Sequence, residues 1–191
     1  RQAILNTIYL HEVVGTRSVR DIYENIEFEL LADINMAEMG KAKYEIPKYG
    51  IKMATGTGKT WVMHALLLWQ YLNAKHEEIP TGRYSKHFLL VAPGLIVYER
   101  LLDAYLGKEN TAGERQFETS DLRQFQDVFI PSNHREEVFG FVQSAVAQKH
   151  EIGSKITGDG IIAVANWHLF MEREDEDNGR ESPLDDPSGA A

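Results

Sequence analysis

Residues 53–60 read Met-Ala-Thr-Gly-Thr-Gly-Lys-Thr, and this stretch decides the fold class. Residues 51–54 lead into it as a short strand candidate, and residues 59–74 follow as a long helix candidate that is apolar almost all round. Glycines let the backbone turn its N–H groups inward, and a helix N-terminus adds partial positive charge, so together they solvate a phosphate. The stretch therefore predicts a P-loop within an α/β fold.

The polar residues of this loop have separate predicted roles. Lys59 would reach the β and γ phosphates and is the candidate catalytic residue, while the hydroxyl of Thr60 would bind Mg²⁺. The strict motif has glycine where this chain has Met53, so the match is to a relaxed form with an intact Gly-x-Gly-Lys-Thr core. The predicted site for ATP and Mg²⁺ comprises Thr55, Gly56, Thr57, Gly58, Lys59 and Thr60.

Strand and helix candidates alternate after the loop. The apolar runs 88–92 and 160–165 predict buried parallel strands, and residues 128–130 predict a short strand between them. Residues 95–106 and 134–150 predict the intervening helices. This order predicts a mostly parallel sheet with helices on both faces, which binds ligands at the carboxyl ends of its strands.

The part before the loop is predicted to be helical. Apolar residues recur at helical spacing in residues 1–14, and Thr16 or Ser18 would cap a second helix that runs to Met39. We therefore expect an N-terminal helical segment at 1–46, a partial P-loop domain at 47–171 and an acidic, mobile tail at 172–191. Because Arg1 already lies in a helical pattern, we also expect an internal piece of a longer polypeptide.

Composition limits the function classes. A length of 191 residues with 43% hydrophobic residues suits one α/β domain, and the absence of cysteine and of any apolar run of membrane-spanning length fits a cytoplasmic protein. The formal net charge of -9 argues against a basic surface over the whole chain, although it leaves room for a local nucleic-acid groove. Six of the seven histidines show no metal-ligand spacing with nearby acids: His64, His76, His87, His134, His150 and His168.

Three segments resemble a known family. Residues 54–60 resemble motif I of superfamily 2 helicases and translocases. Residues 88–101, in which a strand ends in Pro-Gly before a helix, resemble the motif Ia region of the Res subunit of type III restriction enzymes. Residues 161–168 resemble the next strand of that family, which ends in an asparagine.

The resemblance implies a RecA-like P-loop NTPase domain of an ATP-driven DNA translocase from a restriction-modification enzyme. In that family the loops after these strands follow the nucleic-acid backbone, so Pro93, Gly94 and Asn166 become candidate DNA-side residues. Gln2 would correspond to a glutamine that reads adenine. The implied partners are ATP, DNA and a modification methyltransferase subunit, and the implied activities of the whole enzyme are ATP hydrolysis and endonuclease cleavage.

One departure from the family pattern bears on activity. The family needs a carboxylate pair directly after a hydrophobic strand to hold Mg²⁺ and activate water, and no such pair follows a strand candidate here. Glu172 and Glu174 are the nearest acids, and no second motor domain or nuclease motif is visible. We therefore expect this chain alone to bind nucleotide but to hydrolyse it very slowly.

Two other function classes stay open from the sequence. A P-loop kinase acting on a small molecule shares the phosphate loop but needs a lid and substrate-binding arginines, which the sequence does not clearly offer. A nucleotide-binding interaction module without turnover is the other alternative.

Overall fold

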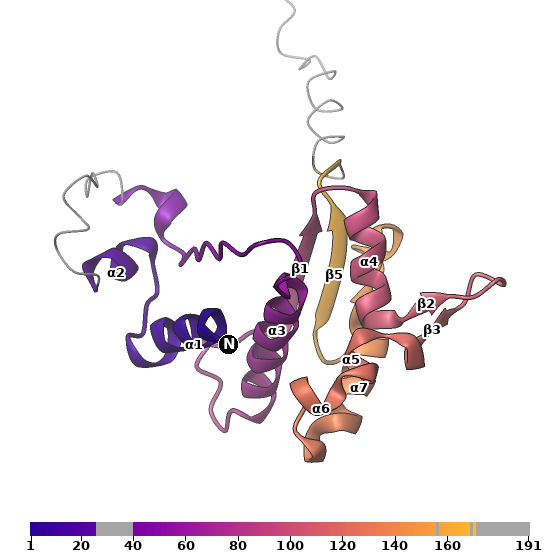
Figure 1. Ribbon diagram of the computed structural model, residues 1–191. Helices are drawn as coiled ribbons and strands as arrows, with labels where there is room; N and C mark the ends of the chain where they lie inside the picture. Colours follow the sequence, from indigo (N-terminus) through magenta and orange to yellow (C-terminus); the bar gives the residue numbers. More distant parts are fainter. Residues whose placement is uncertain (26–39, 156, 169, 171–191) are drawn as a thin grey trace, which may run out of the picture. The chain divides into compact units, whose positions relative to one another are not determined.

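The computed structural model describes residues 1–25, 40–155, 157–168 and 170 (Figure 1). Its internal contacts divide the chain into residues 1–66, here called the loop unit, and residues 67–191, here called the sheet unit. The predicted boundaries after residues 46 and 171 remain predictions, and the predicted tail 172–191 lies outside the described residues.

Short helices make up the first part of the loop unit. Helix α1 (Gln2–Ile8) continues into a π-helical turn, η1 (Tyr9–Val13), and α2 (Val19–Glu24) follows. Ser18 caps α2 as predicted, because its hydroxyl accepts from the Asp21 amide at 3.1 Å and Asp21 accepts from the Ser18 amide at 3.0 Å. A 3₁₀ turn, η4 (Ala42–Tyr44), comes later, and the predicted extension of the second helix over 26–39 lies outside the described residues.

The predicted strand at 51–54 is wrong. These residues adopt no regular structure, and no strand of the described part of the chain pairs with them. A strand holds its extended backbone through hydrogen bonds to a neighbour, so four residues without such a partner remain irregular. The helix predicted behind the loop is present as α3 (Lys59–His76).

A parallel sheet organises the sheet unit. Strand β5 (Ile161–Asn166) lies between β1 (His87–Ala92) and β4 (Val146–Ala147), and both neighbours run parallel to it. Helix α4 (Leu95–Leu106) packs against β1 and β5, and α7 (Arg135–Ala145) packs against β5. Figure 1 shows α4 alongside the two long strands. The two predicted parallel strands, the helix between residues 95 and 106 and the α/β fold class are confirmed.

Two predictions between these strands need correction. Residues predicted as a strand at 128–130 instead end α6 (Gln126–Phe129), because local helical hydrogen bonds such as Ile130 N to Gln126 O, at 2.8 Å, satisfy this backbone where no strand lies beside it. The predicted helix 134–150 ends at Ala145, and the next two residues form β4. Val146 and Ala147 are buried, so pairing with β5 replaces the last helical turn.

Smaller elements complete the sheet unit. A hairpin of β2 (Lys108–Glu109) and β3 (Arg115–Gln116) follows α4 and leads into η5 (Phe117–Thr119) and α5 (Asp121–Gln124). The 3₁₀ turns η6 (Ser132–His134) and η7 (Lys149–Glu151) flank α7 and β4. No helix in the described ranges has the length and apolar character needed to cross a membrane.

Two glycines of the sheet unit sit where no other residue fits. Gly107 has φ +84°, and a Cβ there would lie 1.9 Å from the carbonyl oxygen of Gln116. Gly160 has φ +121°, and its Cβ would lie 2.2 Å from the carbonyl oxygen of Lys86, directly before β5 begins. Backbone carbonyls cannot move aside as flexible side chains do, so both positions require glycine.

Asp159 gathers three donors at the entry to β5. Its Oδ2 accepts from Tyr71 Oη at 3.0 Å and from Lys75 Nζ at 2.6 Å, and its Oδ1 accepts from Lys86 Nζ at 3.4 Å. Partial burial would raise the pKa of Asp159, but these hydrogen bonds outweigh it and hold the pKa below its ordinary value. The network joins α3, β1 and the start of β5.

Candidate functional site

The structure gathers the six predicted phosphate-loop residues into one exposed turn at the start of α3. Gly56 and Gly58 have φ +78° and +87°, which side chains with a Cβ rarely adopt. A Cβ at Gly56 would meet no atom within 4 Å, so space rather than crowding surrounds this backbone. The loop closes on itself through Thr57, whose hydroxyl donates to Ala54 O at 2.7 Å.

Lys59 folds back over this turn. Its Nζ donates to Ala54 O at 2.9 Å and to Met53 O at 3.4 Å, and the side chain is exposed. The ammonium group thus already lies over the loop, and among the described residues its acceptors are two carbonyls that an incoming phosphate oxygen can replace. Thr60, the next residue of α3, is also exposed, and the first amides of a helix have no intrahelical acceptor.

His64 lies one helical turn beyond Thr60 and is fully buried. Burial lowers its pKa to about 4, because the charged imidazolium is poorly solvated away from water. His64 is therefore neutral at pH 7, and Lys59 supplies the positive side-chain charge within residues 53–64.

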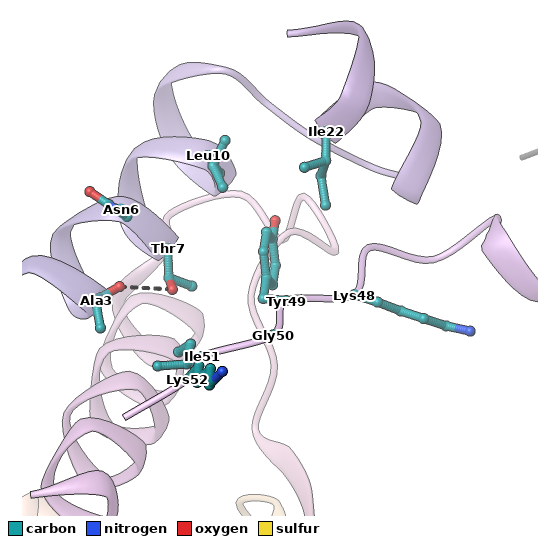
Figure 2. Close-up of a pocket in the computed structure, with 10 residues that line it drawn as sticks. All are labelled: Ala3, Asn6, Thr7, Leu10, Ile22, Lys48, Tyr49, Gly50, Ile51 and Lys52. Atoms are coloured by element: carbon teal, nitrogen blue, oxygen red, sulfur yellow. Dashed lines mark hydrogen bonds between the residues drawn. The ribbon is translucent and has the colours of Figure 1, made fainter. Parts of the chain in front are cut away.

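A pocket of about 390 Å³ opens in the same unit, directly before the loop in sequence. One face of α1 and η1 forms a wall, with residues at positions i, i+3, i+4 and i+7, and the irregular stretch 48–52 that leads into the loop forms another. Figure 2 shows the ring of Tyr49 directed toward Leu10 and Ile22, with the Lys48 side chain pointing away. The lining residues are Ala3, Asn6, Thr7, Leu10, Ile22, Lys48, Tyr49, Gly50, Ile51 and Lys52.

Tyr49 is anchored in this pocket. Its hydroxyl lies 2.7 Å from the hydroxyl of Thr16, which also donates to Leu10 O at 3.0 Å. Thr16 is buried, so the hydrogen bonds hold the turn between α1 and α2 against the pocket wall. Sequence reasoning missed Tyr49 and Asn6, although the helical spacing of Ala3, Asn6, Thr7 and Leu10 marked one face of the first helix.

Gln2 lies beside the pocket but does not line it. It is the first residue of α1, is exposed, and donates from Nε2 to Asn6 Oδ1 at 2.6 Å. Asn6 is a lining residue, so Gln2 positions one amide of the pocket wall.

The three predicted DNA-side residues meet at one edge of the sheet. Asn166 ends β5 opposite Ala92, the last residue of β1, and Pro93 and Gly94 follow Ala92 directly. Gly94 is the N-cap residue of α4, and Trp167 N donates to Ala92 O at 2.9 Å. The carboxyl ends of the two parallel strands thus place these residues together, as the alternating strand-helix order predicts.

Asn166 has an unusual environment at this edge. Asn166 is only 5% exposed, yet its side-chain oxygen Oδ1 has no hydrogen-bond partner within the described ranges. A buried acceptor without a partner is energetically costly, so Asn166 is an exception among the buried polar side chains of this chain.

The expectation that this chain lacks the acidic motif of the family stays a prediction. The candidates Glu172 and Glu174 lie outside the described residues, so Thr60 is the only predicted Mg²⁺ ligand that the structure places. Sequence reasoning also missed a cluster of His76, His134 and Glu137, whose ligand atoms lie within 4.8 Å of one another. The spacing of three residues between His134 and Glu137 was the available signal, but His76 comes from a distant helix.

Comparison with protein families identifies the chain. The family model of the type III restriction enzyme res subunit matches residues 16–178, which include the phosphate loop and both long strands. Neither the curated proteins nor the solved structures gave a match. The family is one of helicase-like ATPase motors with a RecA-like P-loop domain, which agrees with the parallel α/β sheet and argues against a P-loop kinase. With the match covering most of its length, this chain belongs to the type III restriction enzyme res subunit family.

Proposed function

We propose that this chain is the ATP-binding part of a DNA-dependent ATPase motor in a restriction-modification enzyme, and that Thr55 to Thr60 hold the nucleotide phosphates. The observation that carries the proposal is the geometry of the loop. Gly56 and Gly58 turn the backbone at positive φ immediately before an 18-residue helix, and a Cβ at Gly56 would meet no atom within 4 Å. The backbone N–H groups of such a loop and the N-terminus of the following helix together suit a polyanion.

The residues fit an Mg²⁺-nucleotide in charge and in hydrogen-bonding capacity. Lys59 exchanges its bonds to Ala54 O and Met53 O for bonds to phosphate oxygens, and its charge offsets theirs. Thr60 offers an exposed hydroxyl as one oxygen ligand for Mg²⁺. When bound, Mg²⁺ neutralises charge on the phosphates and orients them for transfer to water.

The pocket beside α1 suits the nucleotide base. A volume of about 390 Å³, one aromatic ring and the Asn6 amide supply the mixture of apolar surface and few polar groups typical of small-molecule sites. Gln2 acts on the base through Asn6 in this proposal, because its side chain already binds that amide.

The sheet edge at Pro93, Gly94 and Asn166 is the proposed DNA side. The backbone N–H groups at the start of α4 are suited to donate hydrogen bonds to phosphate oxygens of a nucleic acid, and Asn166 ends the neighbouring strand. The proposed partners of the whole enzyme are DNA and a modification methyltransferase subunit, and its proposed location is the cytoplasm.

Replacing Lys59 tests the phosphate site. Lys59→Ala removes an exposed side chain that donates to two carbonyls of its own loop, so we expect an unchanged melting temperature and at least a tenfold weaker affinity for a fluorescent ATP analogue. Lys108→Ala is the matched control, since Lys108 is an exposed lysine of the sheet unit. Equal affinities of the Lys59→Ala variant and the unaltered chain would exclude Lys59 from the phosphate site.

A further inference from the structure

The C-terminal part of α3 and the start of α7, both in the sheet unit, bring together two imidazoles and one carboxylate. His76 is the last residue of α3, His134 is the N-cap residue of α7, and Glu137 lies in the first turn of α7. Glu137 Oε2 lies 2.9 Å from His76 Nε2 and 3.1 Å from His134 Nδ1. The two imidazole rings are 4.7 Å apart between centroids and inclined by 59°.

The surrounding packing fixes this cluster. Tyr71 of α3 stacks on Phe141 of α7, with ring centroids 3.8 Å apart and an interplanar angle of 8°. Both rings are buried, and each lies about one helical turn from a member of the cluster. His134 and Glu137 share a helix face through their i, i+3 spacing. The three side chains are therefore held by a rigid joint between α3 and α7 rather than by their own contacts alone.

The cluster leaves bonding capacity unused. Glu137 Oε1 is buried and has no hydrogen-bond partner in the described part of the chain, while Oε2 serves both imidazoles. A carboxylate oxygen without a partner is costly away from water, and a bound cation would relieve it. The His76 side chain is 52% exposed, which gives an ion a path to the cluster and leaves room for water as a further ligand.

We propose that His76, His134 and Glu137 bind a divalent transition-metal ion of the Zn²⁺ class. Two imidazoles and one carboxylate form a donor set that suits Zn²⁺, and a water molecule completes a tetrahedron. Ligand bonds of about 2.0–2.1 Å place neighbouring ligand atoms about 3.4 Å apart, and the three ligand atoms already lie within 4.8 Å of one another. Mg²⁺ and Ca²⁺ prefer oxygen ligands, so they are disfavoured here.

Helix orientation supports a cation at this place. His76 lies at the C-terminal end of α3, where the partial negative charge of the helix favours positive ions. The site shares no residue with the proposed phosphate loop, so failure of one proposal leaves the other intact. Occupancy would clamp the end of α3 to the start of α7.

Isothermal titration with ZnCl₂, in the absence of nucleotide and of any histidine tag, tests the site. We expect one ion per chain and a melting temperature that rises with the metal concentration. Co²⁺ should give the visible absorption of a tetrahedral complex. Glu137→Gln and His134→Ala should each weaken Zn²⁺ binding by at least tenfold, because each removes a direct ligand.

Matched controls keep the result interpretable. Glu136→Gln changes the same charge one residue away on an exposed side chain, and His150→Ala removes an exposed histidine outside the cluster. Both controls should bind Zn²⁺ as the unaltered chain does. The proposal is overturned if the unaltered chain shows no saturable binding, or if binding survives both cluster substitutions. Glu137→Gln retains size and shape, so its effect can be measured even if His134→Ala fails to fold.

Discussion

Glycines with positive φ occur both in the phosphate loop and in the sheet unit, but for different physical reasons. At Gly107 and Gly160 an added Cβ would collide with a backbone carbonyl oxygen, so glycine is needed for close packing. At Gly56 the same Cβ would meet nothing within 4 Å. The empty space is what a phosphate-binding loop requires, since the ligand must approach the backbone closely. The same residue type thus allows close packing at Gly107 and Gly160 and leaves open space at Gly56.

The largest expected effect on stability comes from replacing a glycine whose added Cβ would collide with the backbone. Gly160→Ala forces a Cβ against Lys86 O and a side chain into φ +121°, so we expect a loss of about 3 kcal/mol or more in the free energy of unfolding. Gly140→Ala is the control, because this α7 position is open and helical and should gain about 0.5–1 kcal/mol. Urea denaturation of both variants measures the difference. Equal stabilities would show that the backbone around Gly160 can shift to accommodate a Cβ.

An intermediate effect on stability is expected from replacing Gly56, where an added Cβ has open space around it. Gly56→Ala meets no steric obstacle, so only the positive φ opposes it, at about 1–2 kcal/mol. Its distinctive effect should be at least a tenfold weaker affinity for the fluorescent ATP analogue, because the loop amides lose their inward direction. Gly113→Ala, in the exposed turn between β2 and β3, has φ +81° and should cost similar stability with unchanged nucleotide affinity. Loss of affinity in both variants would remove the distinction between the two loops.

The smallest effect concerns polar packing at the entry to β5. Asp159→Asn removes the charge that Lys75 and Lys86 neutralise, and these ion pairs are partly exposed, so we expect a loss of about 1 kcal/mol at pH 7. The folded-state pKa of Asp159 is depressed, so its stabilisation is present above the unfolded pKa and is lost as pH falls through the lower folded value. The difference between the two proteins should therefore fade below about pH 4. A difference that stays constant from pH 7 to pH 3 would contradict this assignment.

The fold could be predicted from sequence where a local apolar pattern agrees with the pairing of strands. The apolar runs at 88–92 and 160–165 are long enough to be recognised as buried strands, and they pair in parallel. Val146 and Ala147 form a strand of only two residues, and their sequence continues a helical pattern. Their strand pairing depends on β5, which lies later in the chain, and no local pattern reports it.

The candidate site also has a part that could be predicted from sequence and a part that could not. The phosphate loop is a contiguous stretch, so its residues could be named from sequence, and the pairing of β1 with β5 could be expected to gather Pro93, Gly94 and Asn166. The pocket and the histidine cluster combine residues from separate helices. Tyr49 faces Leu10, and His76 meets Glu137, only because of tertiary packing.

The register of the sheet also sets an order for folding. His87 of β1 pairs with Ile161 of β5, and Val146 of β4 pairs with Ile162. The first pairing closes a loop of about 74 residues and the second a loop of about 16, so the first costs about 1.4 kcal/mol more in closure entropy. We therefore expect β4 and β5 to associate early. Strand β1 should pair with β5 later, after the intervening helices have formed and reduced the effective loop between the two strands.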